Sequence, residues 1–253
     1  MTRIIAVVSG KGGVGKTTFV SNVSVILSRY FGMDVTVVDC NLSTPHLGLY
    51  MGLFYTPITL NEVLRGEAKS EEALYKHSSG VKILPASLNI FELRSIDVLN
   101  LEKVVKDLEG KTEIIFLDAA PGIGREAISA IRASNEVIFV TTPFLPCIAD
   151  IIRCKEIVEE VGAKPLGTVL NMVTSLRTEL KKEEVEKLTG LPVLASIPYD
   201  NNIRFSLGLS TPLFLINPES KASREFLRLA ANLIGAEIKE SPIHKLLLRM
   251  KFW

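Results

Sequence analysis

Short apolar runs alternate with helix-periodic stretches along nearly the whole chain. The runs are rich in valine and isoleucine, and they predict strands at residues 4–9, 35–39, 81–85, 113–118, 136–141, 167–171 and 192–197. Helical patterns lie between or after them, at residues 16–30, 101–108, 125–133, 148–161, 179–188 and about 218–234. Several runs are apolar at nearly every position, which is typical of strands buried on both faces. The alternation predicts a single α/β domain with a mostly parallel, twisted sheet and helices on both faces.

The composition agrees with a globular domain and excludes other classes of protein. The chain has 253 residues, of which 47% are hydrophobic and 23% charged, so it can bury a sizeable core and is not of the disordered class. Its three cysteines, Cys40, Cys147 and Cys154, include no CxxC pair, which argues against a disulfide framework or a thiolate metal site. The apolar stretches at residues 137–149 and 205–218 are too short for a membrane-spanning helix and contain prolines.

The charge is distributed unevenly along the chain. The net charge is +1, yet residues 241–253 contain Lys245, Arg249 and Lys251 and no acid, which leaves the rest of the chain at −2. A slightly acidic body disfavours nucleic acid as a partner.

The first predicted strand runs into a glycine-rich loop that matches G-x-x-x-x-G-K-[ST]. In such a loop the backbone N–H groups surround phosphate oxygens, and the following helix adds its positive N-terminus. We expect Lys16 to reach the β- and γ-phosphates of ATP and Thr17 to bind Mg²⁺. The predicted nucleotide contacts in the loop are Gly10, Lys11, Gly12, Gly13, Val14, Gly15, Lys16, Thr17 and Thr18.

A second lysine in this loop, Lys11, is typical of one group of ATPases. The segment from Lys11 to Thr18 resembles the deviant Walker A loop of the MinD/ParA family, with the closest similarity to its archaeal MinD-type members. The resemblance extends from Arg3 to about Ile238. In that family the early lysine crosses a dimer interface to the partner's nucleotide. The resemblance therefore implies a homodimer that forms on ATP, with Lys11 acting on the other subunit.

Two acidic positions of the family follow the second predicted strand. Asp39 matches the first, which the resemblance places in a switch region near Mg²⁺, and Asn41 stands where the family usually has a second aspartate that positions the attacking water. Asparagine can hydrogen-bond to a water molecule but cannot accept a proton from it. We therefore expect ATP hydrolysis to be slow, and an ATP-binding regulator without hydrolysis stays as an alternative.

The fourth long strand ends in the Walker B pattern of four apolar residues followed by Asp118. Asp118 is expected to hold Mg²⁺ through a water molecule. The resemblance implies that Gly122, four residues later, offers its backbone N–H to the γ-phosphate and acts as a nucleotide-sensing switch.

Three further positions match the family at later strand ends. The resemblance implies that Asn171, Pro198 and Asp200 contact the adenine base. Asp150 matches an interface acid that pairs with the early lysine in the nucleotide-free state. Alternatively, the Asp150 carboxylate could interact with the partial positive charge at the N-terminus of its helix, which is an equally good interpretation.

The C-terminal segment carries a helix-periodic apolar stripe beside basic residues. The stripe consists of Ile243, Leu246, Leu247, Met250 and Trp253. A short basic amphipathic helix of this kind favours the surface of an anionic membrane, and members of the MinD branch end in a similar segment. Docking on the protein's own core or in a partner's groove, and a disordered basic end, are the alternatives.

Together these features predict an ATPase domain at residues 1–238 and an amphipathic tail at residues 239–253. The resemblance implies a cytoplasmic switch ATPase that uses ATP and Mg²⁺, binds peripherally to the inner face of the cell membrane, and positions cell-division or other polar machinery with an unidentified protein partner or activator. A ParA-like partition ATPase on DNA is the main alternative. A metallocluster carrier is less favoured because it would need ligand thiols.

Overall fold

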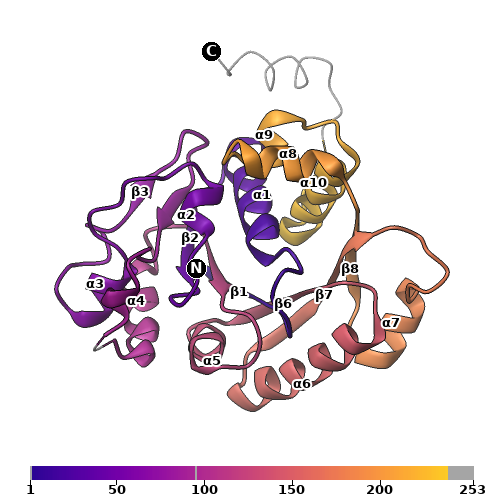
Figure 1. Cartoon of the computed structure of the whole chain (residues 1–253), viewed down its shortest axis with the longest axis horizontal. Coiled ribbons are helices and arrows are strands. Elements are labelled where there is room, and N and C mark those ends of the chain that lie inside the picture. The colour runs from indigo at the N-terminus through magenta and orange to yellow at the C-terminus, as the bar shows by residue number, and fades with distance from the viewer. Residues whose placement is uncertain (1, 95, 239–253) are drawn as a thin grey trace.

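The computed structural model describes residues 2–94 and 96–238 (Figure 1). Within these residues one eight-stranded sheet has the order β3-β4-β2-β5-β1-β6-β7-β8. Only the β3–β4 pair is antiparallel. The strands are β1 Arg3–Val8, β2 Val35–Cys40, β3 Tyr75–Lys76, β4 Lys82–Leu84, β5 Ile114–Ala119, β6 Glu136–Thr141, β7 Lys164–Val173 and β8 Val193–Pro198.

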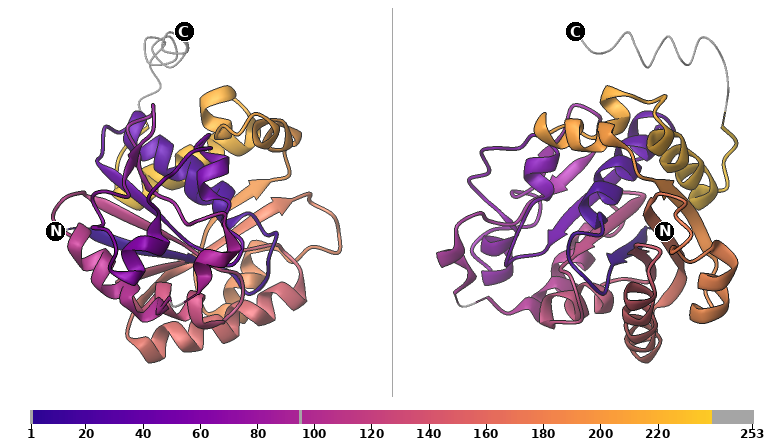
Figure 2. Two further views of the ribbon diagram at one scale, coloured as in Figure 1. Left: turned by 60° about the vertical axis from the view of Figure 1, so that its left-hand side comes forward. Right: turned by 45° about the vertical axis from the view of Figure 1, so that its right-hand side comes forward.

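Helices cover both faces of this sheet (Figures 1 and 2). The α-helices are α1 Lys16–Arg29, α2 Leu47–Tyr50, α3 Leu60–Arg65, α4 Leu101–Leu108, α5 Arg125–Arg132, α6 Leu145–Val161, α7 Lys182–Thr189, α8 Asn201–Gly208, α9 Leu213–Ile216 and α10 Lys221–Ile234. Two 3₁₀ turns precede α4, η1 at Ile90–Leu93 and η2 at Val98–Asn100. Helices α1 and α10 lie on one face, and α5, α6 and α7 lie on the other.

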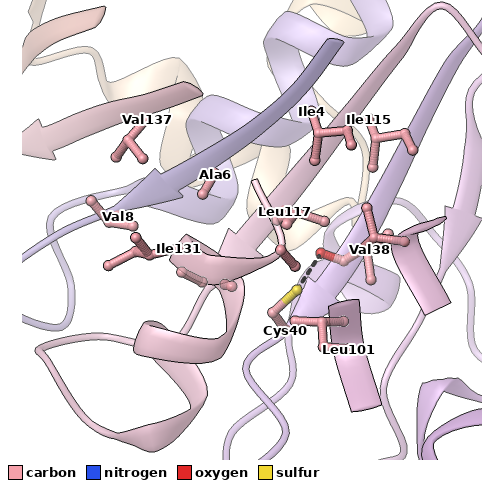
Figure 3. Packing of buried hydrophobic residues seen from close by; sticks show 14 of the residues in the cluster. Ile4, Ala6, Val8, Val38, Cys40, Leu101, Ile115, Leu117, Ile131 and Val137 are labelled. Carbon is pink, nitrogen blue, oxygen red and sulfur yellow. Dashed lines mark hydrogen bonds between the residues drawn. The ribbon is translucent and has the colours of Figure 1, made fainter. Parts of the chain in front are cut away.

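Each face of the sheet has its own hydrophobic core, because side chains along a strand alternate between the two faces. In β1, Ile4, Ala6 and Val8 belong to the core that includes residues of α4, α5 and α6. Figure 3 shows them with Leu101 of α4 and Ile131 of α5. Ile5 and Val7 belong to the other core, with α1 and α10. This double burial explains why the strands read as continuous apolar runs in the sequence.

The predicted strands and helices are confirmed, with small shifts at their ends. Helix α7 begins three residues later than predicted, because the carboxylate of Glu179 accepts hydrogen bonds from the backbone of Thr174 and Ser175 and holds a loop there. The elements that the prediction missed have at most eight residues each: β3, α2, α3, η1, η2, α8 and α9. A signal for α3 was present, since Thr59 and Glu62 form a capping box at its start.

Strand β1 lies between β5 and β6, so the strand order changes direction at its carboxyl end. In open α/β sheets the ligand-binding crevice lies at such a point. No helix in the described part of the chain is long and apolar enough to span a membrane. The predicted tail stripe of Ile243, Leu246, Leu247, Met250 and Trp253 lies outside the described residues.

Candidate nucleotide site

The glycine loop after β1 forms a turn that leads directly into α1. Gly15 precedes the helix with φ +94°, a left-handed conformation that glycine adopts at low cost. Lys16, the first residue of α1, is only 8% exposed, and its Nζ donates a hydrogen bond to Ser9 Oγ at 2.8 Å. Burial lowers the pKa of Lys16, an effect that the nearby Asp118 carboxylate partly offsets. The loop thus presents a largely desolvated ammonium group beside the first turn of a helix.

Two glycines of the loop are required by close neighbours. A Cβ atom at Gly10 would lie 2.1 Å from Cβ of Asp150, and one at Gly15 would lie 2.2 Å from Nδ2 of Asn171. Both distances are far below van der Waals contact. Only glycine therefore allows the loop to approach α6 and the end of β7 this closely.

Two carboxylates lie side by side beneath the loop. Asp39 on β2 pairs in register with Asp118 on β5, and both side chains are only 1% exposed. Burial raises the pKa of Asp118 to about 6, although a hydrogen bond from Thr17 and the charge of Lys16 oppose the increase. Burial and the charge of Asp118 raise the pKa of Asp39 well above its ordinary value.

The arrangement around Asp118 is suited to a divalent cation. Thr17 Oγ1 donates to Asp118 Oδ2 at 2.6 Å, whereas Asp118 Oδ1 is buried and has no hydrogen-bond partner among the described residues. Hydroxyl and carboxylate oxygens are the ligands that Mg²⁺ prefers. An unpartnered buried oxygen beside a second carboxylate is costly without a cation, so these residues fit a Mg²⁺ ion.

The strain in this pair predicts a stability change for Asp118→Asn. The pKa of Asp118 is raised from 3.8 to about 6 in the folded protein, so ionisation of Asp118 lowers the free energy of unfolding. This loss of stability is absent below about pH 4 and is complete once the pH has risen through 6. Removing the charge should stabilise the metal-free protein at pH 8 by about 3 kcal/mol, or roughly 6–12 °C in Tm, and abolish Mg²⁺-dependent nucleotide binding. Thermal unfolding with EDTA checks this. The exposed control Asp107→Asn should leave Tm unchanged, and an unaltered Tm in Asp118→Asn would contradict the prediction.

Asn41 follows Asp39 but is held in a turn of its own. Its Nδ2 donates to the carbonyl and hydroxyl oxygens of Thr44 at 2.6 and 3.0 Å, and its Oδ1 accepts a hydrogen bond from the same hydroxyl. Asp39 accepts hydrogen bonds from the backbone N–H groups of Asn41 and Leu47 at 3.2 and 3.0 Å. The carboxylate of Asp39 thereby fixes the segment that leads into α2.

Lys11 and Asp150 form an ion pair, with 3.5 Å between Nζ and Oδ2. Lys11 is about half exposed, whereas the Asp150 side chain is 23% exposed. The prediction that Asp150 opens a helix is wrong: α6 begins at Leu145, so Asp150 lies in its second turn. The effect of the helix dipole has declined by that position, and the observed partner of Asp150 is Lys11.

A cavity of about 520 Å³ opens above the loop. Its phosphate end is lined by Gly12, Gly13, Gly15, Lys16, Thr17, Thr18, Asn41 and Thr44. Its other end is lined by Asn171, Met172, Pro198, Tyr199, Asp200, Ile203, Arg204 and Leu207. The cavity therefore brings together most of the predicted phosphate-contacting and base-contacting positions, from segments far apart in the sequence.

Asn171 and Asp200 differ in how free their side chains are. Asn171 Nδ2 donates to the Val14 carbonyl at 2.7 Å, while its buried Oδ1 has no partner among the described residues and can accept a hydrogen bond from a base. Asp200 instead caps two helices, because Oδ1 accepts from Asn202 N at 2.9 Å and Oδ2 from Ala222 N at 3.3 Å.

The remaining predicted residue, Gly122, lies beside the loop with φ +80°. Its N–H donates to the Ser9 carbonyl at 2.9 Å. The group predicted to sense the γ-phosphate is thus bonded to the phosphate loop in this structure.

Sequence reasoning missed several cavity-lining residues, among them His46, Tyr50 and Arg204. They lie on or beside the short helices α2 and α8. An N-cap aspartate was the sequence signal for α8, but no comparable signal marks α2. Among the described residues no group of three or more His, Cys, Asp or Glu side chains is placed to hold a metal ion.

Comparison with known proteins agrees with the loop and the fold. A family profile described as "ParA: NUBPL iron-transfer P-loop NTPase" matches residues 1–234. An ATP-binding protein of Methanocaldococcus jannaschii is 35% identical, over 94% of this chain and 89% of that protein. The cell division ATPase MinD of Pyrococcus furiosus superposes with a TM-score of 0.90 at 34% identity, covering 93% of this chain and 99% of the other.

A second solved structure is the septum site-determining protein MinD of Pyrococcus horikoshii in complex with Mg-ADP. It superposes with a TM-score of 0.89 at 36% identity, over 94% of this chain and all of that chain. The resemblance seen in the Lys11–Thr18 segment is confirmed by these similarities, and the chain belongs to the ParA/MinD family of P-loop NTPases, close to archaeal MinD.

Proposed function

We propose that this protein is a MinD-type ATPase that binds ATP and Mg²⁺, dimerises on ATP and then associates with the cytoplasmic membrane. The observation that carries the proposal is the set of buried Lys16, buried Asp118 and partly buried Thr17 below a 520 Å³ cavity, with one unpartnered carboxylate oxygen. The Mg-ADP complex of the P. horikoshii relative supports the same ligands here. Residues 1–238 form the ATPase domain in this proposal.

The site residues divide the work of binding between them. Backbone N–H groups of the loop and Lys16 bind the phosphates, and Thr17 and Asp118 hold Mg²⁺, which offsets negative charge on the β- and γ-phosphates. Asn171 accepts a hydrogen bond from the adenine amino group through its free Oδ1. Pro198 lies against the base, and Asp200 supports this end of the site by capping α8 and α10.

Dimerisation uses Lys11 in this proposal. In the free subunit Lys11 is paired with Asp150. In the dimer Lys11 leaves Asp150 and binds the more strongly charged phosphates of the nucleotide in the partner subunit. At the same time the γ-phosphate competes with the Ser9 carbonyl for the N–H of Gly122. Both changes occur at the loop, so ATP binding and exposure of the dimer surface are coupled.

The membrane step relies on residues 239–253, with the stripe of Ile243, Leu246, Leu247, Met250 and Trp253 facing lipid. One short helix binds weakly, but two helices on one dimer raise the avidity by roughly 10²–10⁴-fold. Membrane residence then follows the nucleotide state, and the dimer positions division or other polar machinery with the help of a protein partner or activator.

Deletion of residues 239–253 tests the membrane step. We expect the intact protein to co-sediment with anionic liposomes at least 10-fold more with ATP than with ADP, and the deleted protein to remain in the supernatant in both cases. ATP-dependent dimerisation in solution should survive the deletion. Equal sedimentation of both proteins would contradict the proposal, and a scrambled tail of the same composition serves as the control for charge.

Asn41 predicts the rate of hydrolysis. Since an amide cannot take a proton from the attacking water, Asn41→Asp should raise the single-turnover rate by about 10-fold. This gain is smaller than the roughly 100-fold or more of general-base catalysis, because positioning dominates phosphoryl transfer. The matched control is Asn135→Asp, outside the cavity. An unchanged rate in Asn41→Asp would contradict the explanation. A regulator that binds ATP without turnover is the second candidate function, and Asn41 is the observation that favours it.

A further inference from the structure

The phosphate end of the cavity needs a group that orients the attacking water, and the structure leaves few such groups. Asn41 and Thr44 satisfy each other's side chains through hydrogen bonds. Lys16 and the N–H groups of the loop are donors and cannot accept a hydrogen bond from water. The Asp200 carboxylate is at the other end and caps two helices.

Tyr50 also lines this wall of the cavity, but burial raises the pKa of Tyr50, so its hydroxyl stays protonated and is a poor base. The remaining side chain on this wall that can take a proton is His46. It lines the cavity together with Asn41 and Thr44, and its side chain is exposed. No described residue forms a hydrogen bond with its imidazole, whose nearest aromatic neighbour is the Tyr50 ring at 6.2 Å between centroids. A neutral imidazole offers one nitrogen that accepts a hydrogen bond and can take a proton.

The backbone around His46 is tied to the Mg²⁺ side of the site. The Asp39 carboxylate accepts a hydrogen bond at 3.0 Å from the backbone N–H group of Leu47, the residue that follows His46. Asp39 is in register with Asp118 on the neighbouring strand. A change at the proposed Mg²⁺ site can therefore move the His46 ring relative to the phosphates.

We infer that His46 holds the attacking water and supplies the basic group that position 41 lacks. This inference rests on the proposed ATPase function. In the step, the water oxygen forms a bond to the γ-phosphorus while the bond from that phosphorus to the leaving ADP oxygen breaks. The water proton passes to the free imidazole nitrogen and then to the released phosphate, so His46 returns to its neutral form.

The test separates turnover from binding in the full-length protein. His46→Ala should lower the single-turnover rate of ATP hydrolysis by about 10–100-fold, because positioned general bases contribute at least this much. The Kd for a non-hydrolysable ATP analogue should stay within about 2-fold of the unaltered protein, since His46 is not needed for phosphate binding. His77→Ala is the matched control, because His77 bonds to Ser79 away from the cavity.

A double variant adds a result that a structural role would not produce. In Asn41→Asp/His46→Ala the new carboxylate should restore hydrolysis to at least the rate of the unaltered protein. The inference is overturned if His46→Ala hydrolyses ATP normally, if its analogue Kd weakens as much as its rate falls, or if the double variant stays inactive. If the unaltered protein binds no ATP, the proposed function fails. If it binds ATP and dimerises without hydrolysis, the ATPase assignment fails together with the role of His46, and the regulator without turnover is favoured. If it hydrolyses ATP and His46→Ala does so at the same rate, only the role of His46 fails.

Discussion

Lys16→Ala should abolish useful ATP binding, with at least a 100-fold increase in Kd. Lys16 is only 8% exposed as a residue, and its ammonium group has no carboxylate ion-pair partner among the described residues. Its Nζ is held by the Ser9 hydroxyl. A charge-assisted bond to phosphate in such a desolvated place is worth about 3 kcal/mol or more, which corresponds to a factor of 100 or more.

Titration of a fluorescent ATP analogue would measure this loss. Removing a buried charge should not unfold the free protein, so the Tm of the nucleotide-free Lys16→Ala variant should match or exceed that of the unaltered chain. Lys106→Ala on the exposed side of α4 is the control and should bind normally. A Kd within about 3-fold in Lys16→Ala would contradict the assignment of the site.

Lys11→Ala should separate binding from dimerisation. The Lys11 side chain is 48% exposed, and its removal costs a single ion pair, the one with Asp150. ATP affinity of the monomer should therefore change by less than about 5-fold, in line with the small worth of exposed ion pairs. Dimerisation on ATP should disappear, and hydrolysis should fall about 100-fold or more, as when an arginine finger is removed.

Sedimentation velocity with ATP and with ADP measures the oligomeric state of this variant. Asp150→Asn is the informative companion, because it frees Lys11 from its partner in the same subunit and should strengthen the dimer if the ion pair competes with assembly. A Lys11→Ala protein that still dimerises on ATP would show that another group holds the interface.

The sheet was predictable because burial on both faces leaves a clear trace in the sequence. The run that became β5 is apolar at four successive positions before Asp118, and all of β5 is buried. By contrast, α2 has four residues and a single buried one, Leu47. An element this short has no periodicity to detect, since its position depends on the Asp39 carboxylate, which lies on another element.

The candidate site was predictable to the same extent. The glycine loop follows β1 and Asp118 is the penultimate residue of β5, so their spacing alone placed them at one edge of the sheet. The resemblance supplied Asn171 and the Lys11–Asp150 pair. In the structure Asn171 bonds to Val14 of the loop, and Asp150 bonds to Lys11 of the loop. His46 escaped because a single histidine in an uncharged segment has no motif, and only the path of the chain after Asn41 brings it to the cavity.

The paired carboxylates of Asp39 and Asp118 have a consequence for the lifetime of the protein in a cell. Two buried acids in register make the empty protein less stable than the loaded one, and bound nucleotide and cation lower the unfolded population by mass action. Proteases act on that unfolded population. When ATP is scarce, degradation should accelerate, so the abundance of this protein would follow the energy supply of the cell.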